Sequence, residues 1–473
     1  MTSIFYDLET TDIQFVGQII NYAFVVVDDD WNIIDSLVGD VKISRLQLPT
    51  PSAILANRVF LGAHQVQADK SEPEVMYNIR EFLQKYVEKR TKGEKIQLIG
   101  YNSNKFDLPF LRTSMLRNGI NPYFSKHSIQ YKDLYHLTQK LATTNINFTN
   151  VVDVTGSLSL EKVTNSLKLL SGKQDHHSLS DVNLSIKLAR HYANTFGIDI
   201  RKWSAFEVDM EKAKDSVVSR VMMNGKRLEN KNEVPVLEPK MLLLDYDEKG
   251  GQSLWINLSE YDKNPVVSRD MVHWFNHATG IFLLDADSDI DHYDTATEQD
   301  CDIRNAFASS INLSNYFPPK NCDVEQFIYM MNFEEKDALY EAIWMNDLSR
   351  IKSLQSKNAS ELLLRYCAAH KDINDPVVEK IFRKYCAYRY GGKMKISKEN
   401  YDIKYQPGIY SDAFHPTYNE YLSEIDEKIN STTTEAMDKE LLISLKEFIL
   451  NSDINFFCGT DLAKINRVKV TNA

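Results

Sequence analysis

A segment near the N-terminus, residues 4–11, limits the possible folds more than any other part of the chain. Its first three residues, Ile-Phe-Tyr, form an apolar run that predicts a buried β-strand ending at Asp7. Residues two apart on a strand point to the same side, so the side chains of Asp7 and Glu9 should project together. Neighbouring carboxylates repel unless a cation lies between them, and Mg²⁺ or Mn²⁺ suits such oxygen ligands. The alternative is that Asp7 begins a turn and Glu9 is solvated.

A second acidic residue follows another expected strand. Residues 96–101 are strand-like, a polar loop follows, and Asp107 opens a helical pattern over 107–116. This arrangement makes Asp107 a candidate third carboxylate. The alternative is that Asp107 only caps the helix, a role that aspartate favours, and that Phe106 is plain core.

A third group lies before the strongest amphipathic pattern of the chain, residues 179–192. Asp181 is expected on a face of this helix, and His176 directly precedes the helix. An imidazole can accept a proton from water near neutral pH, which makes His176 a candidate general base. The alternative reading is an exposed histidine pair, His176 and His177, followed by an ordinary aspartate at a helix start. We expect that description to hold for His177.

The order of expected elements divides the chain into three parts. A chain of 473 residues is long enough for about three domains. Strands at 4–6, 19–27, 31–37 and 96–101, with helices at 74–86, 107–116 and 179–192, predict an α/β domain with a mixed sheet over 1–200. Short apolar segments between turns at 241–246, 253–258 and 281–286 predict a β-rich domain over 201–317. Helical patterns at 324–331, 334–347, 362–370, 377–388 and 435–451 predict a helical domain over 318–473.

Composition indicates the cellular compartment of the protein. Its five cysteines are scattered, without a C-x-x-C pair, which argues for a reducing compartment and against a disulfide framework or a zinc site built from cysteines. We find no secretory signal pattern and no apolar run long enough to span a membrane. The sequence therefore predicts a cytoplasmic protein. A net charge of −11 does not suggest a polyanionic partner, but binding one needs only a local basic strip.

Residues 377–397 form such a strip, in which basic and aromatic residues alternate. Arg383, Lys384 and Arg389 are candidates for contacts with phosphates, while aromatic rings stack on bases in sequence-tolerant single-strand sites. The alternative is a surface helix with a solvated basic face and a buried aromatic face. Both descriptions can hold at once.

Near the carboxylates, four residues are candidates for lining the terminal nucleotides of a substrate: Thr10, Tyr101, Asn102 and Phe106. The alternative for Asn102 is that it holds its own loop together. Residues 51–60 are expected to form a loop beside them.

Taken together, the three motifs in this order resemble the DEDDh class of 3′→5′ exonucleases, which has a ribonuclease-H-like fold. The runs LIGYNSNKFD, SLSLEKVTNSL and KIFRKYCAYRYGG are similar to those of the exonuclease I family, as is the order of parts. The resemblance implies an exonuclease domain, an SH3-like β-rich domain and a helical C-terminal domain. Asp12 stands where a glycine commonly follows the first motif, and the central domain matches only loosely.

The resemblance also implies a function. Asp7, Glu9, Asp107 and Asp181 would bind two Mg²⁺ (or Mn²⁺) ions, with His176 as general base. The chain would be a monomeric, processive 3′→5′ exodeoxyribonuclease that degrades single-stranded DNA to mononucleotides in DNA repair or recombination. It would dock to the acidic tail of single-stranded-DNA-binding protein.

Two other functions remain open at this point. A DEDDh RNA exonuclease of the oligoribonuclease kind would share the motifs, although such enzymes need only the first domain. A catalytically silent single-strand-binding replication protein would keep the fold but lack a carboxylate, and no carboxylate is missing here.

Overall fold

The computed structural model describes most of the first 311 residues and one helical pair near the C-terminus. The described residues are 2–13, 17–43, 49–117, 120, 122, 128–144, 147–148, 158–170, 176–203, 206–219, 221–222, 240–247, 252–276, 282–283, 292–311, 334–335, 338 and 418–451.

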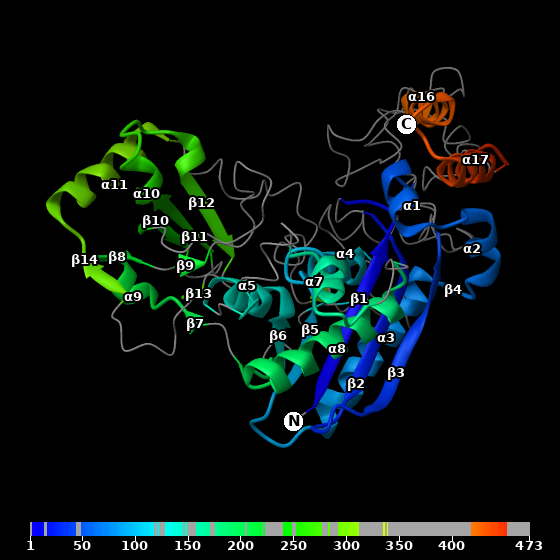
Figure 1. The fold of residues 1–473 in the computed structure, drawn as a ribbon, viewed down its shortest axis with the longest axis horizontal. Helices are drawn as coiled ribbons and strands as arrows, with labels where there is room; N and C mark the ends of the chain where they lie inside the picture. The colour runs from blue at the N-terminus through cyan, green and yellow to red at the C-terminus, as the bar shows by residue number, and fades with distance from the viewer. Residues whose placement is uncertain are drawn as a thin grey trace, which may run out of the picture.

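A six-stranded mixed sheet forms the centre of the first domain, in the order β4-β3-β2-β1-β5-β6 (Figure 1). β1 runs antiparallel to β2 and parallel to β5, β5 is parallel to β6, and β3 is antiparallel to β2 and parallel to the short β4. The strand bounds are β1 Ser3–Thr10, β2 Ile19–Val27, β3 Ile33–Lys42, β4 Lys70–Ser71, β5 Ile96–Gly100 and β6 Ile129–Asp133. The predicted α/β domain with a mixed sheet is confirmed.

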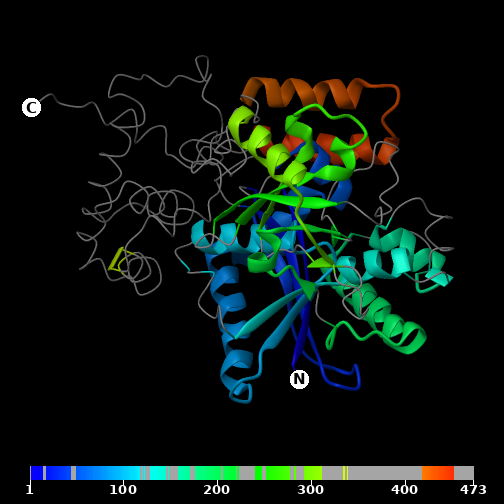
Figure 2. The ribbon, with the colours of Figure 1, turned by 90° about the vertical axis from the view of Figure 1, so that its left-hand side faces the viewer.

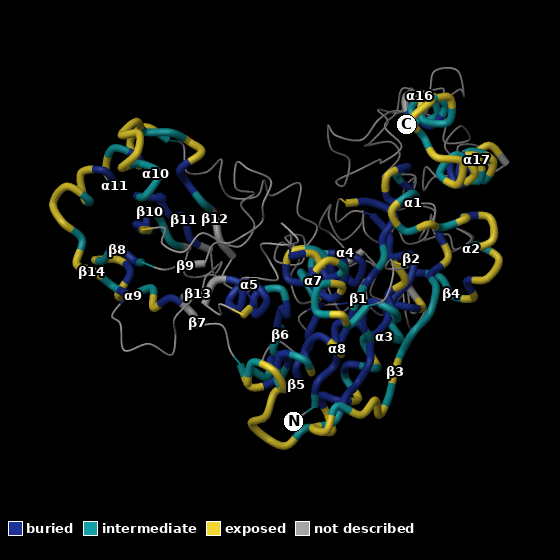
Figure 3. The backbone as a smooth tube through the Cα atoms, in the orientation of Figure 1, coloured by how far each residue is buried: buried dark blue, intermediate teal, exposed yellow. Residues whose placement is uncertain are grey.

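Helices cover both faces of this sheet, and each face has its own apolar core. The bounds are α1 Pro51–Asn57, α2 Leu61–Gln67, α3 Glu72–Lys89, α4 Asp107–Arg117, α5 Leu134–Thr144, α7 Leu160–Ser166 and α8 Ser178–Phe196. Core residues of α3 and α4 lie in one cluster, and those of α5, α7 and α8 lie in the other. β1 and β2 run through the buried centre between these layers (Figure 3).

Side chains along β1 point alternately to the two helical layers, and this alternation determines which layer Asp7 and Glu9 face. Ile4, Tyr6 and Leu8 belong to the cluster that contains α3 and α4. Phe5 belongs to the opposite cluster, which contains α8. Since side chains alternate along a strand, Asp7 and Glu9 share the side of Phe5 and face α8.

Two strand boundaries and one expected loop differ from the sequence-based expectations. β1 does not end at Asp7 but continues to Thr10. The third strand begins at Ile33, because Trp31, with φ 68°, still belongs to the preceding turn. The expectation of a loop at 51–60 is wrong: α1 occupies most of it, with Thr50 as its N-cap and a proline in its first turn.

The β-rich part, which faces the viewer in Figure 2, contains two sheets. One is five-stranded, in the order β12-β11-β10-β8-β14, and the other is three-stranded, in the order β7-β13-β9. The strand bounds are β7 Phe206–Glu207, β8 Ser216–Val218, β9 Val221–Met222, β10 Met241–Asp247, β11 Gln252–Asn257, β12 Val272–Asn276, β13 Phe282–Leu283 and β14 Tyr293–Thr295. The strands expected near 241–246 and 253–258 are present. The helical elements are α9 Met210–Ala213, α10 Leu258–Tyr261, η1 Arg269–Met271 and α11 Glu298–Ser310, of which α11 was not expected.

Two C-terminal helices, α16 Tyr418–Asn430 and α17 Ala436–Asn451, pack against each other, and α17 packs on α1 and α2 of the first domain (Figures 1 and 2). The helix expected at 435–451 is confirmed, whereas α16 was not expected. The patterns at 324–331, 362–370 and 377–388 lie outside the described residues, as does most of 334–347. Among the described residues, no helix is both long and apolar enough to cross a bilayer.

Candidate active site

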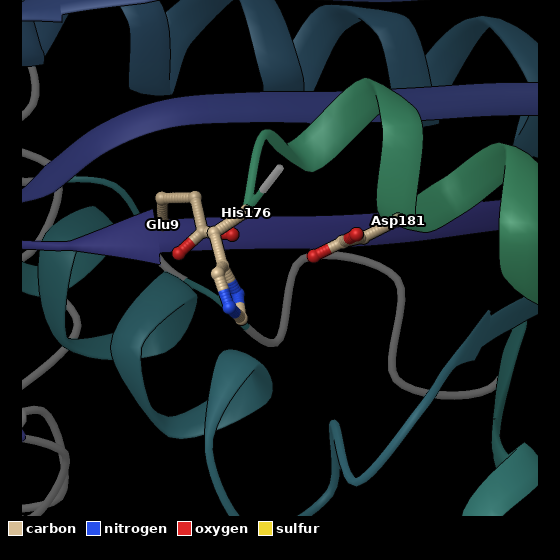
Figure 4. A group of neighbouring side chains, drawn as sticks. All are labelled: Glu9, His176 and Asp181. Carbon is tan, nitrogen blue, oxygen red and sulfur yellow. The ribbon is translucent and has the colours of Figure 1, made fainter. Parts of the chain in front are cut away.

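The end of β1 and the start of α8 form the centre of the candidate site. Ligand atoms of Glu9, His176 and Asp181 all lie within 4.8 Å of one another (Figure 4). Glu9 comes from β1, Asp181 from the first turn of α8, and His176 from the residues just before that helix. Asp181 is buried, Glu9 is half-buried and His176 is exposed. The arrangement offers two carboxylates and one imidazole to a shared space, and it could hold a metal ion.

The backbone just before α8 turns sharply. His176 adopts the left-handed conformation, with φ 51°, which is uncommon for a residue other than glycine. The N–H of Ser178 donates to the Asn21 side chain on β2 over 3.1 Å, and the His177 ring accepts from the N–H of Leu179 over 3.4 Å. The start of α8 is therefore fixed to the sheet beside Glu9, since Asn21 is the register partner of Glu9.

The charges of the other three carboxyl groups act on the carboxyl group of Asp7. Burial raises its pKa well above the ordinary aspartate value, and the charges of Asp107, Glu9 and Asp181 raise it further. The charges of all three neighbours therefore disfavour ionisation of Asp7. Such an accumulation of like charge is strongly relieved by a bound cation.

Asp107 is the first residue of α4, and it reaches β1 through a backbone contact. Its Oδ1 accepts a hydrogen bond from the N–H of Leu8 over 2.9 Å. Burial raises the pKa of Asp107 to about 7, while this hydrogen bond acts in the opposite direction. The charges of Asp133 and Asp181 add to the increase.

Glu9, His176 and Asp181 fit a divalent cation. The donor set is rich in oxygen, which hard cations such as Mg²⁺ and Mn²⁺ prefer, and the single imidazole is also a ligand for Zn²⁺. The observation that supports this fit is geometric: the ligand atoms of Glu9, His176 and Asp181 all lie within 4.8 Å of one another. Glu9, His176 and Asp181 are the residues that the structure brings together to hold it, while the part of Asp7 and Asp107 in metal binding stays a prediction.

One carboxylate of this region was missed from the sequence. Asp133, at the end of β6, is buried and accepts three backbone hydrogen bonds: from Asn102 over 2.7 Å, from Asn104 over 3.0 Å and from Tyr135 over 2.9 Å. It holds the loop that leads from β5 to Asp107. The available signal was an aspartate between a strand and a helix, which resembles the signal that identified Asp107.

The same loop requires a glycine at its start. A Cβ on Gly100 would lie 2.3 Å from the Cβ of Ser103, which is closer than two side chains can approach. Asn102 follows with φ 57°, a conformation that asparagine tolerates better than most residues. The turn before Asp107 is therefore tightly specified by its sequence.

The candidate nucleotide-lining residues have defined internal contacts. The Thr10 hydroxyl donates to the carbonyl of Asp12 over 2.7 Å, and the Tyr101 hydroxyl donates to the carbonyl of Leu158. Asn102 holds its own loop through its backbone, and Phe106 packs against Phe110 with 4.9 Å between ring centroids. Contact of these residues with nucleotides stays a prediction. Arg383, Lys384 and Arg389 lie outside the described residues.

Several solved structures with the same fold are those of exonuclease I. A moderately thermophilic exonuclease I from Methylocaldum szegediense is 16% identical, with 99% of each chain covered and a TM-score of 0.58. E. coli exonuclease I in complex with a 5cy-dA13 oligonucleotide is 14% identical, with 95% of this chain and 99% of that chain covered and a TM-score of 0.62.

A zinc-bound form of the E. coli exonuclease I complex with single-stranded DNA is 15% identical, with 94% of this chain and 98% of that chain covered and a TM-score of 0.54. No protein-family model and no curated protein sequence matches the chain. The fold predicted from the sequence, an α/β nuclease-type domain followed by further domains, is confirmed: the chain has the fold of exonuclease I.

Proposed function

We propose that this protein is a metal-dependent 3′→5′ exodeoxyribonuclease that hydrolyses single-stranded DNA to mononucleotides. The observation that carries the proposal is the convergence of Glu9, His176 and Asp181 within 4.8 Å, next to the electrostatically linked pair Asp7 and Asp107. Exonuclease I structures with the same fold, one of them bound to a dA13 oligonucleotide, support it.

His176 is the general base of the proposed reaction. Its ring is exposed and next to Glu9 and Asp181, so it can reach a water molecule in the shared space. A ring nitrogen takes a proton from this water as the oxygen attacks the phosphorus atom of the terminal phosphodiester. The bond between phosphorus and the 3′ oxygen breaks, and that oxygen takes up a proton. The products are a 5′-mononucleotide and a strand shortened by one nucleotide.

The carboxyl groups would hold the cations that this chemistry needs. Asp7, Glu9, Asp107 and Asp181 would bind two Mg²⁺ or Mn²⁺ ions, which neutralise charge on the scissile phosphate and on the leaving oxygen when bound. The residues themselves supply a rigid frame: Asp107 is fixed to β1 by the Leu8 N–H, and α8 is fixed to β2 by Asn21. A preorganised frame of this kind avoids reorganisation during the reaction.

Single-stranded DNA is the proposed substrate, with Arg383, Lys384 and Arg389 contacting its phosphates and Thr10, Tyr101, Asn102 and Phe106 next to the terminal nucleotides. We further propose a cytoplasmic monomer that acts in DNA repair or recombination and docks to the acidic tail of single-stranded-DNA-binding protein. The chain extends far beyond its first domain, which favours DNA over the short RNA substrates of single-domain relatives of the same class.

A panel of labelled oligonucleotides tests this function. DNA and RNA, single and double strands, and blocked 3′ or 5′ ends are compared with Mg²⁺ and with excess chelator. We expect mononucleotides from single-stranded DNA with a free 3′ end, and no release in chelator. Asp7→Ala serves as the control, since it should stop release while strand binding persists. Rapid loss of RNA with DNA intact, or equal release by wild type and Asp7→Ala, contradicts the proposal.

A further inference from the structure

The β1–β2 ladder changes register between Glu9 and Thr10, directly after the candidate metal ligand. Helix α1 and its N-cap provide hydrogen-bond donors to the backbone that follows Glu9. The Asn57 side-chain amide donates to the carbonyl of Thr10 over 2.8 Å. The backbone N–H and the hydroxyl of Thr50, the N-cap of α1, donate to the carbonyl of Thr11 over 2.8 and 3.1 Å. The two ends of α1 therefore hold the two residues after Glu9.

Helix α1 is in turn held by the C-terminal helical pair. The buried Tyr421 hydroxyl of α16 donates to the carbonyl of Pro49, next to Thr50. Arg58, at the end of α1, forms an ion pair with Asp438 of α17, with 3.1 Å between nitrogen and oxygen. These contacts join segments about 380 residues apart, and they lie at opposite ends of the same short helix.

We infer that α16 and α17 position Glu9 through α1, with Asn57 as the positioning residue that contacts the strand end. The inference rests on the proposed function only in that Glu9 is taken as a metal ligand. A seven-residue helix has little stability of its own, so its place depends on what it packs against. Loss of the C-terminal contacts would let α1 move, and the carbonyl of Thr10 would move with it.

A consequence is that the C-terminal helices affect metal binding even when no DNA is present. If α16 and α17 served only to bind DNA, weakening their contacts would change the degradation of long strands and leave Mn²⁺ affinity unchanged. Some residues hold a metal ligand in place by hydrogen bonds without binding the metal themselves. Removing such a residue typically lowers metal affinity or activity about 10–100-fold. We expect the lower end of that range, because Asn57 contacts the backbone next to Glu9 and not its carboxylate.

The experiment uses full-length variants and measures Mn²⁺ affinity without nucleic acid, by calorimetry or electron paramagnetic resonance. Asn57→Leu keeps the size of the side chain but removes its donor, and we expect Mn²⁺ affinity to fall about tenfold. Ala56→Ser, an exposed change on the same helix, is the matched control. Thermal unfolding of each variant separates a shift at the metal site from a loss of folded protein. Wild-type Mn²⁺ affinity in Asn57→Leu overturns the positioning role.

Charge reversal tests the C-terminal half of the inference. Arg58→Asp and Asp438→Arg each place like charges at the α1–α17 contact, and the combined variant restores opposite charges. We expect both single variants to bind Mn²⁺ more weakly, with partial recovery in the double variant. Tyr421→Phe, which removes one hydroxyl, should weaken binding in the same direction. Equal affinity in all of these variants overturns the link to α16 and α17.

Turnover of a trinucleotide, which is too short to reach distant parts of the molecule, gives a second measurement. We expect kcat to fall in Asn57→Leu by a larger factor than KM rises, because Glu9 is displaced while only Thr10 among the proposed nucleotide contacts moves with it. One outcome is that the wild type releases no nucleotide while the variants still bind Mn²⁺ more weakly than the wild type. In that case the proposed function fails and the positioning role stands. Weaker turnover of long strands alone, with trinucleotide turnover and Mn²⁺ affinity unchanged, contradicts the positioning role.

Discussion

The backbone N–H of Leu8 donates to the carboxyl group of Asp107 over 2.9 Å, although the two residues are 99 positions apart. Leu8 lies between Asp7 and Glu9 on β1, so this hydrogen bond joins the first acidic motif to the second. It also limits Asp107 to one orientation at the start of α4. The geometry of the candidate site therefore depends on the pairing of β1 with β5, which precedes the loop to Asp107.

The raised pKa of Asp107 predicts that the stability of the metal-free protein depends on pH. Burial raises its pKa to about 7 in the fold from 3.8, so the folded state binds more protons than the unfolded state between these values. The contribution of Asp107 to the free energy of unfolding is then present in full below about pH 4 and is lost as pH rises to about 7. We expect Asp107→Asn, which still accepts the Leu8 hydrogen bond, to reduce this loss by about 4 kcal/mol.

Chemical denaturation in excess chelator at pH 5 and at pH 8 measures the effect. Wild type should be less stable at pH 8 than at pH 5, and Asp107→Asn should show a smaller difference. Mg²⁺ or Mn²⁺ should restore wild-type stability at pH 8 more than that of the variant. An identical pH dependence in the two proteins would show that Asp107 is not the group responsible.

Asp133 gives a second prediction, because its carboxylate satisfies three backbone N–H groups. Asp133→Ala leaves buried donors without this acceptor, at a cost of about 1–3 kcal/mol for an unsatisfied group. We expect a lower melting temperature and, since the loop to Asp107 loosens, at least a severalfold loss of nucleotide release. Asp262→Ala, at an exposed position, is the control. Unchanged activity at a temperature where the variant is fully folded contradicts the link between Asp133 and Asp107.

Local sequence was enough to predict part of this site. The spacing of Asp7 and Glu9 requires one shared side of a strand, and the distance from His176 to Asp181 suits a residue before a helix and one in its first turn. The sequence alone did not reveal which layer of helices the two β1 carboxylates would meet. That depends on the sheet order, which comes from pairings between distant segments.

Helix α1 was missed for a different physical reason. Seven residues are too few to show a repeating apolar face, and the segment begins with a proline that also suits a loop. Thr50 followed by Pro51 was the usable signal, since both favour a helix start. α16 was missed although Tyr421 and Ile425, both buried, are spaced by one helical turn.

Asn21 leads to a third prediction. Its side chain accepts the Ser178 N–H over 3.1 Å, and it lies opposite Glu9 in the β1–β2 register. Asn21→Leu removes the acceptor from a buried helix start, with an expected cost of about 1–2 kcal/mol. Hydrogen exchange of the Ser178 amide should accelerate, and nucleotide release should fall with it. Asn194→Leu, near the other end of α8 and exposed, is the control. Wild-type exchange at Ser178 in Asn21→Leu contradicts this account.

The basic strip gives the last prediction. If Arg383, Lys384 and Arg389 each contact one phosphate, their joint change to alanine removes three counterion-releasing contacts. The slope of log affinity against log salt concentration should then become shallower by about 2, since each contact on a single strand contributes about 0.7. Affinity should also fall at low salt, with the largest loss there. Changing Lys89, Lys92 and Lys95 to alanine removes the same charge from exposed positions before β5, at the opposite end of β1 from Glu9. An equal change of slope in both triple variants would mean that net charge, and not this strip, governs strand binding.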